Sequence, residues 1–232
     1  MNRPIKLLIL IVMSLSVYFI YQNTKESNIQ ILSLGDGLSK GINSYTISEY
    51  SHLNYYEDYL KKQNKKVNLI TKYSKKDLTI HELLELVKTN NTLKRDLMES
   101  HILFITVGYN DLLYKMSLEE DISIPKLNKI IDEINNEYNE LLKEISKYYK
   151  NEIIVIGYPK SNKDDYYLSL GVRKLNKILN SNTYIDTYNL LNNRNKYFSN
   201  PNSFYPNRYG YKKIYEEIKR IVNYWYLIDF IL

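Results

Sequence analysis

The strongest constraint on the fold is an alternation of short apolar segments with longer amphipathic ones. Apolar runs occur at 30–35, 67–71, 101–108, 152–157 and 183–188, and helical patterns lie between and after them, at 46–62, 79–87, 124–149, 168–180 and 207–223. Strands that alternate with helices favour a parallel sheet covered on both faces. The pattern predicts a three-layer α/β/α sandwich with a five-stranded, parallel, flavodoxin-like sheet.

Two helix starts have recognisable signals. Thr79 is followed three residues later by Glu82, the spacing of a capping box. Pro125 falls in the first turn of the long helix predicted for 124–149. These signals predict where the two helices begin. The carboxyl ends of the strands then lie together at one edge of the sandwich.

The N-terminus predicts a membrane anchor. Arg3 and Lys6 precede an uncharged apolar run from Leu7 to Tyr21, close to the shortest length that spans a bilayer. We expect residues 1–22 to be an uncleaved signal anchor, 23–28 a linker, and 29–232 an extracytoplasmic domain. A cleaved signal peptide and a buried helix are the alternatives. The apolar C-terminal residues 224–232 are expected to pack on the domain, or to contact the membrane interface.

Composition excludes several classes of site. The 232 residues include no cysteine, so disulfides and thiolate metal sites are excluded. The net charge of +6 is spread along the chain rather than clustered, which argues against nucleic-acid binding. No histidine and carboxylate pair has metal-ligand spacing, and no cofactor is expected.

Three motifs fall at the carboxyl ends of predicted strands, where ligands bind in such sheets. The first, "LGDGLSKG", contains Asp36 and Gly37 in a glycine-rich turn. The second, "ITVGYND", places Gly108 and Asn110 after the third strand. The third, "NSFYPNRYGY", precedes the last helix. Each has a structural explanation alone: a βα turn, a helix cap, a loop entering a helix.

Together these motifs resemble the SGNH/GDSL hydrolase family over about residues 29–222. The resemblance implies an esterase-like or deacylase-like scaffold. It also implies that Gly37 replaces the nucleophilic serine, Asn202 the orienting aspartate and Tyr205 the histidine base. Asn110 and the Gly37 N–H remain as candidate oxyanion donors, with Asp36 and Gly108 beside them. The family's donor glycine after the second strand is absent from "ITKYSKKD".

The sequence therefore predicts a pseudoenzyme. We expect a membrane-anchored protein that lacks triad ester hydrolysis and binds acyl, acetyl or glycan groups of the cell envelope. Two alternatives remain: an active esterase with an unrecognised nucleophile, and a scaffold protein. For the active alternative, Ser39 and His81 are the residues to test, whereas His52 and His101 are expected to lie in a helix and at the opposite sheet edge.

Overall fold

The computed structural model describes residues 12–16, 28–63, 65–160, 165–180, 183–200 and 202–228. Most of the predicted anchor lies outside these ranges, although residues 12–16 are helical. Within the part of the chain that the structure describes, no helix has both the length and the apolar character needed to cross a membrane.

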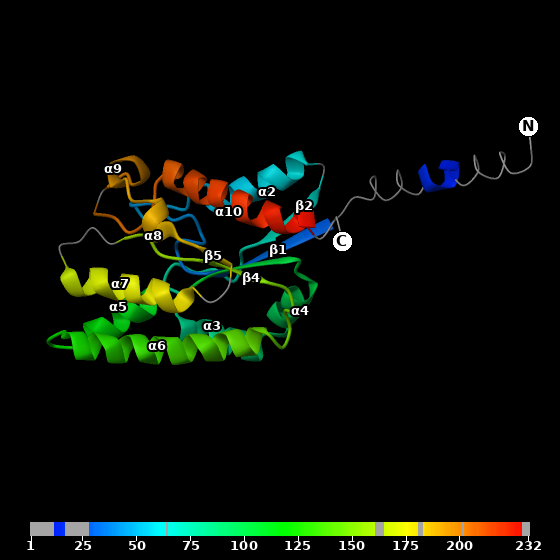
Figure 1. The fold of residues 1–232 in the computed structure, drawn as a ribbon. Coiled ribbons are helices and arrows are strands. Elements are labelled where there is room, and N and C mark those ends of the chain that lie inside the picture. The colour runs from blue at the N-terminus through cyan, green and yellow to red at the C-terminus, as the bar shows by residue number, and fades with distance from the viewer. Residues whose placement is uncertain are drawn as a thin grey trace, which may run out of the picture.

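A five-stranded parallel sheet forms the centre of the domain (Figure 1). Its order is β2-β1-β3-β4-β5. The strands are β1 (Asn28–Gly35), β2 (Lys66–Ile70), β3 (Ile102–Thr106), β4 (Ile153–Ile156) and β5 (Thr183–Ile185). The predicted sheet is confirmed. Every residue of the central strand β3 is buried, which explains why its sequence is a continuous apolar run rather than an alternating one.

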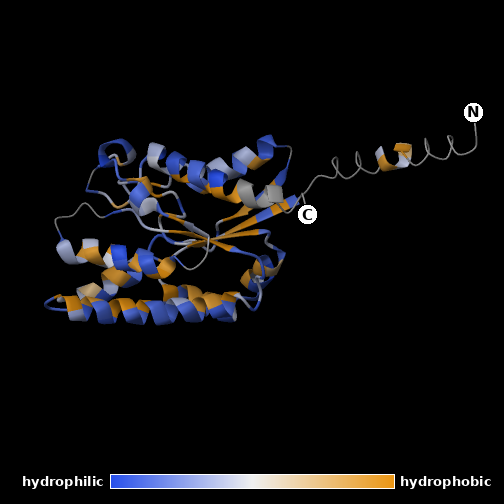
Figure 2. Ribbon diagram, in the orientation of Figure 1, coloured by the Kyte–Doolittle hydropathy of each residue, from blue (hydrophilic) through white to orange (hydrophobic). Residues whose placement is uncertain are grey.

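Helices cover both faces of the sheet (Figure 1). One layer holds α3 (Ile80–Thr89), α4 (Asn91–Glu99), α5 (Tyr109–Ser117), α6 (Ile124–Ile145) and α7 (Tyr166–Leu179). The other holds α2 (His52–Lys62), α10 (Arg208–Ile228) and the short helices α8 (Thr187–Leu190) and α9 (Arg194–Tyr197). In Figure 2 the strands are mostly hydrophobic and the helices have hydrophilic outer faces. The expected three-layer sandwich is therefore present.

The helix boundaries differ from prediction in identifiable places. The helix predicted for 46–62 begins at His52, because Ser51 and Asn54 form a reciprocal capping box there. The capping box at Thr79 and Glu82 is confirmed. Helix α4 was not predicted, since Asn90 both ends α3 and caps α4, so the two read as one interrupted pattern. Helix α6 ends at Ile145, four residues before the predicted end.

The strand register brings the first two motifs together. Gly35 at the end of β1 lies opposite Thr106 at the end of β3. The next residue, Asp36, donates its backbone N–H to the Thr106 carbonyl at 2.9 Å. The turns that follow these two strands are therefore neighbours at the carboxyl edge of the sheet.

Candidate functional site

The turn after β1 is organised around the buried carboxylate of Asp36. One carboxylate oxygen accepts the Leu38 backbone N–H at 2.9 Å, and the other accepts the Tyr158 hydroxyl at 2.6 Å. Burial raises the pKa of Asp36 to about 7, although both hydrogen bonds oppose that rise. Asp36 therefore shapes the turn that follows β1.

Tyr205 covers Gly37, the residue predicted to replace a nucleophilic serine. A Cβ atom on Gly37 would lie 2.6 Å from the Tyr205 hydroxyl oxygen and 2.8 Å from two of its ring carbons. Glycine is needed here because the tyrosine ring occupies the space of a side chain. Burial raises the pKa of the Tyr205 hydroxyl above its ordinary value. Tyr205 is therefore a poor base, and its ring blocks the neighbouring turn.

Asn202 lies on the exposed loop that leads to α10. Its backbone N–H donates to the Asn200 side-chain oxygen at 2.9 Å. Its amide is neutral and lacks the charge with which an aspartate stabilises an imidazolium. Of the three residues that the sequence predicts as triad replacements, the structure thus places Tyr205 against Gly37 and leaves Asn202 exposed.

Asn110 holds the loop between β2 and α3. Its side-chain amide donates to the Leu78 carbonyl at 2.9 Å and to the Lys76 carbonyl at 3.3 Å. The backbone N–H of Gly37 donates to the same Lys76 carbonyl at 3.2 Å. The two candidate oxyanion donors therefore converge on one oxygen, as an oxyanion hole requires, but that oxygen belongs to the protein.

The loop after β2 supplies an acceptor where the resemblance implied a donor. The Lys75 N–H turns back to the Gly35 carbonyl at 2.9 Å, and the Ser74 hydroxyl donates to the Ser33 carbonyl at 3.1 Å. These bonds fix the peptide that carries the Lys76 carbonyl. Where the resemblance implies a donor glycine, this loop therefore presents an acceptor, the Lys76 carbonyl.

Asp111 and Gly108 have structural surroundings. Both carboxylate oxygens of Asp111 accept the Ile80 backbone N–H, at 3.0 and 3.1 Å, at the start of α3. Burial raises the pKa of Asp111 to about 6. Gly108 has a φ of 121°, and a Cβ there would lie 3.1 Å from a methyl carbon of Leu175. The second motif therefore positions the β2–α3 loop and starts α5.

The other candidate nucleophile and bases lie elsewhere. Ser39 is buried, and its hydroxyl oxygen occupies the space where a Cβ on Gly35 would stand, so it points back toward the strand. His81 is exposed in the first turn of α3. His101 accepts the Gln30 N–H at 3.2 Å, at the amino edge of the sheet. None of these contacts pairs a hydroxyl with an imidazole.

His52 was expected to be at the surface or in packing, and the structure shows that it is completely buried. Its ring stacks on Tyr211 with centroids 6.0 Å apart, and neither ring nitrogen has a hydrogen-bond partner. Burial lowers the pKa of His52 to about 3. It is therefore a neutral core residue.

An aromatic cluster at this edge was not predicted. The rings of Tyr109 and Phe204 stack with centroids 3.7 Å apart, and Tyr158 packs 5.5 Å from Tyr109 and 5.6 Å from Phe204. Phe204 and Tyr205 remain partly exposed. The only sequence signal for Tyr158 was its position directly after Gly157 at the end of a strand.

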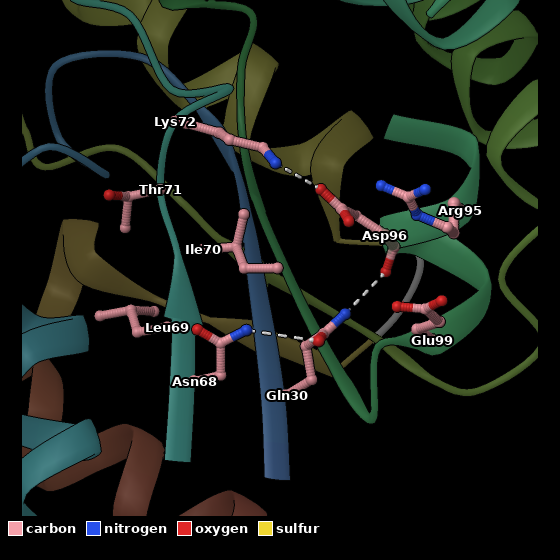
Figure 3. A pocket seen from close by; sticks show the side chains of 9 residues that line it. All are labelled: Gln30, Asn68, Leu69, Ile70, Thr71, Lys72, Arg95, Asp96 and Glu99. Carbon is pink, nitrogen blue, oxygen red and sulfur yellow. Dashed lines mark hydrogen bonds and ion pairs between the residues drawn. The ribbon is translucent and has the colours of Figure 1, made fainter. Parts of the chain in front are cut away.

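A separate hollow of about 800 Å³ lies beside β2 and α4 (Figure 3). Its lining includes none of Gly37, Asn110, Asn202 or Tyr205. Lys72 and Asp96 form an ion pair at 2.8 Å, and Gln30 donates to the Asp96 carbonyl (Figure 3). Among the described residues, no group of three or more histidine, aspartate or glutamate side chains could hold a metal ion.

No family model matches this sequence, and neither does any curated protein. Solved structures do match. A lipase, Lip_vut3, from a goat rumen metagenome is 19% identical, with a TM-score of 0.71 over 83% of this chain and 96% of that one. A member of the lipolytic G-D-S-L family from Veillonella parvula is 16% identical, with a TM-score of 0.60 over 83% and 97%.

An acetylxylan esterase, Axe2, from Geobacillus stearothermophilus is 14% identical, with a TM-score of 0.60 over 84% of this chain and 94% of that one. Similarity at this level of identity concerns the fold. The chain therefore has the fold of the SGNH/GDSL lipolytic hydrolases.

Proposed function

We propose that this chain is a membrane-anchored, extracytoplasmic protein that keeps the SGNH hydrolase scaffold without triad ester hydrolysis. In this proposal the carboxyl edge of the sheet binds acyl, acetyl or glycan groups of the cell envelope. The anchor is residues 1–22, and the binding surface is the aromatic loop beside Gly37.

The observation that carries the proposal is the Lys76 carbonyl. It accepts both the Gly37 N–H and the Asn110 amide, the two groups that would otherwise stabilise an oxyanion. Loss of the triad alone removes a factor of about 10⁶ from turnover in a serine protease. The residual catalysis of such an enzyme comes from binding and its oxyanion hole, and here the donors are already used.

The aromatic loop supports a binding function. Phe204 and Tyr205 are partly exposed, and Phe204 is held by its stack on Tyr109. Rigid aromatic rings offer apolar area with little loss of side-chain entropy, which suits an acyl group or the C–H face of a sugar ring. Aromatic rings held in place beside a turn whose N–H donor is already hydrogen-bonded favour ligand binding without catalysis.

An active esterase is the main alternative, because the solved structures of this fold are named as a lipase and an acetylxylan esterase. Such an enzyme needs a nucleophile within reach of a base. Ser39 faces Gly35, and His81 lies exposed in the first turn of α3. The scaffold alternative differs from our proposal only in having no ligand at the edge.

Hydrolysis tests separate the first two. The full-length protein is incubated with a short activated ester and with a fluorophosphonate probe. We expect no turnover above the buffer rate and no labelling. Turnover that disappears in Ser39→Ala would overturn the proposal in favour of the active esterase.

Binding tests separate the proposal from a scaffold. An acetylated oligosaccharide and a short-chain fatty acid are titrated against the full-length protein by calorimetry. We expect saturable binding of at least one probe that is lost in Phe204→Ala. The matched control is Tyr114→Ala, which removes a ring that is 62% exposed on α5. Absence of binding for both probes, or equal loss in the control, would favour the scaffold alternative.

A further inference from the structure

The two edges of the sheet differ in how they connect to the rest of the chain. Six residues separate Tyr21, the end of the apolar run, from Asn28, the first residue of β1. An extended chain of six residues spans at most about 20 Å. If the apolar run up to Tyr21 lies in a bilayer, the amino edge of the sheet must stay within that distance of its surface.

The last helix ends at this same edge. Helix α10 begins after the Tyr205 loop and runs for 21 residues, about 31 Å, back along the sheet. It ends at the amino edge of the sheet, on the side of the domain where β1 starts (Figure 1). The last residues of α10, 224–228, read "YWYLI", and tryptophan and tyrosine favour the headgroup region of a membrane.

Lysines lie at the same edge. Lys62 ends α2, Lys65 precedes β2, Lys66 is the first residue of β2, and Lys150 lies between α6 and β4. Cations near the C-terminus of a helix also complement its dipole, which accounts for Lys62. Lys65, Lys66 and Lys150 lie beyond the helix ends. An anionic bilayer attracts such residues when they are close to its surface.

We propose that the amino edge of the sheet is a membrane-facing surface, which rests on the membrane anchor of the proposed function. Strand β1 is eight residues long and spans about 26 Å, and Gly37 lies beyond its far end. The carboxyl edge then faces away from the membrane. Its ligand is a group presented from the aqueous side, an acetyl or acyl group carried on a glycan, rather than a lipid tail still in the bilayer.

The lack of cysteine allows a direct test. Four single-cysteine variants of the full chain are labelled with a small fluorophore: Lys62→Cys and Lys150→Cys at the amino edge, Lys40→Cys and Lys196→Cys at the carboxyl edge. All four side chains belong to exposed residues. Each variant is reconstituted in phosphatidylglycerol and phosphatidylcholine vesicles, with and without a headgroup spin label that quenches at short range.

We expect quenching of the two amino-edge labels and none of the two carboxyl-edge labels. Equal quenching at both edges, or stronger quenching at Lys40→Cys and Lys196→Cys, would overturn the inference while leaving the anchor intact. If a carbonate wash removes the chain from the vesicles, the anchor fails, and this inference fails with it.

A second arm tests the lysines. Neutralising Lys62, Lys65, Lys66 and Lys150 to glutamine should weaken the quenching of an amino-edge label at Asn151→Cys, and 0.5 M salt should do the same because it screens exposed charges. The matched control neutralises Lys40, Lys76, Lys160 and Lys196 at the other edge and should leave quenching unchanged. Unchanged quenching in the first variant would show that the lysines do not contact the bilayer.

Discussion

The sheet and the loops at its carboxyl edge are stabilised in different ways. The sheet is filled by apolar side chains, and all five residues of β3 are buried. The edge is held by polar contacts among its own loops: Asp36 with Tyr158, Asn110 with the β2–α3 loop, and Gly37 with Lys76. In a hydrolase some of these donors would be left for substrate. Here the fold has kept the packing, and the polar groups of the site satisfy one another.

Restoring chemistry at the edge should produce the largest effect. The triple variant Gly37→Ser, Asn202→Asp, Tyr205→His supplies the triad that the proposed function lacks, but the Lys76 carbonyl still accepts the Gly37 N–H and the Asn110 amide. Adding Lys76→Gly and Asp77→Gly should let the peptide between residues 76 and 77 flip, so that its carbonyl points away from the donors, because glycine tolerates positive φ. We expect ester turnover to rise by about 10²–10³ between the two variants, the contribution of one oxyanion donor.

The measurement is initial-rate hydrolysis of a short activated ester, with circular dichroism as the control for folding. If the triple variant is as active as the variant with all five substitutions, the Lys76 carbonyl does not limit catalysis. Such a result would also weaken the contrast between a sheet held by apolar packing and an edge whose polar groups hydrogen-bond to one another.

The pH dependence of stability should distinguish two buried groups. His52 has a pKa of about 3 in the folded protein, below its unfolded value near 6.5. The folded protein therefore loses stability as the pH falls from about 6.5 to about 3, because His52 is buried in its neutral form. Asp36 has a raised pKa of about 7, so it loses stability as the pH rises from about 4 to 7. Each slope is about 1.4 kcal/mol per pH unit.

Urea unfolding of the wild type and of His52→Phe between pH 4 and 7 tests the first group. The difference in unfolding free energy should grow steadily in favour of the variant as the pH falls. Asp36→Asn should show the opposite trend relative to the wild type. Parallel curves for wild type and His52→Phe would mean that His52 is charged, or hydrated, in the folded protein.

The sequence predicts the sheet better than the edge, and the reason is physical. Buried strands and amphipathic helices follow from the periodicity of apolar residues, and the cap at Thr79 follows from one hydroxyl and one carboxylate. The direction of the Lys76 peptide does not follow in this way. It depends on the Lys75 N–H bond to the Gly35 carbonyl and on the bonds that the Lys76 carbonyl accepts from Gly37 and Asn110, residues far apart along the chain. The sequence predicts that Gly37 and Tyr205 replace a serine and a histidine, but it does not predict that the Tyr205 ring contacts Gly37.

That steric contact predicts a coupled pair of substitutions. Gly37→Ala should destabilise the protein by about 1–3 kcal/mol, because its Cβ would meet the Tyr205 ring and the well-packed edge must shift. Tyr205→Ala removes the ring, so the cost of Gly37→Ala should largely vanish in the double variant. A double-mutant cycle by urea unfolding measures the coupling, and additive effects would place the ring elsewhere in solution.

The smallest effect is expected at Thr46, on the loop that follows the first motif. Its φ of 62° is unfavourable for a β-branched residue, and the Asn43 side chain holds the turn by accepting the N–H groups of Tyr45 and Ile47. Thr46→Gly should therefore stabilise the protein by about 0.5–1 kcal/mol in thermal unfolding. A loss of stability would indicate that the threonine side chain contributes more than its backbone conformation costs.

The central claim is that the oxyanion donors of this edge are bound by the protein itself. The most direct test is NMR of the Gly37 amide in the isotopically labelled full-length protein, read as a scalar coupling through the hydrogen bond to the Lys76 carbonyl carbon. We predict a measurable coupling together with slow exchange of the amide proton with solvent. No coupling, with rapid exchange, would mean that the Gly37 donor is free to bind an oxyanion, and would contradict this account.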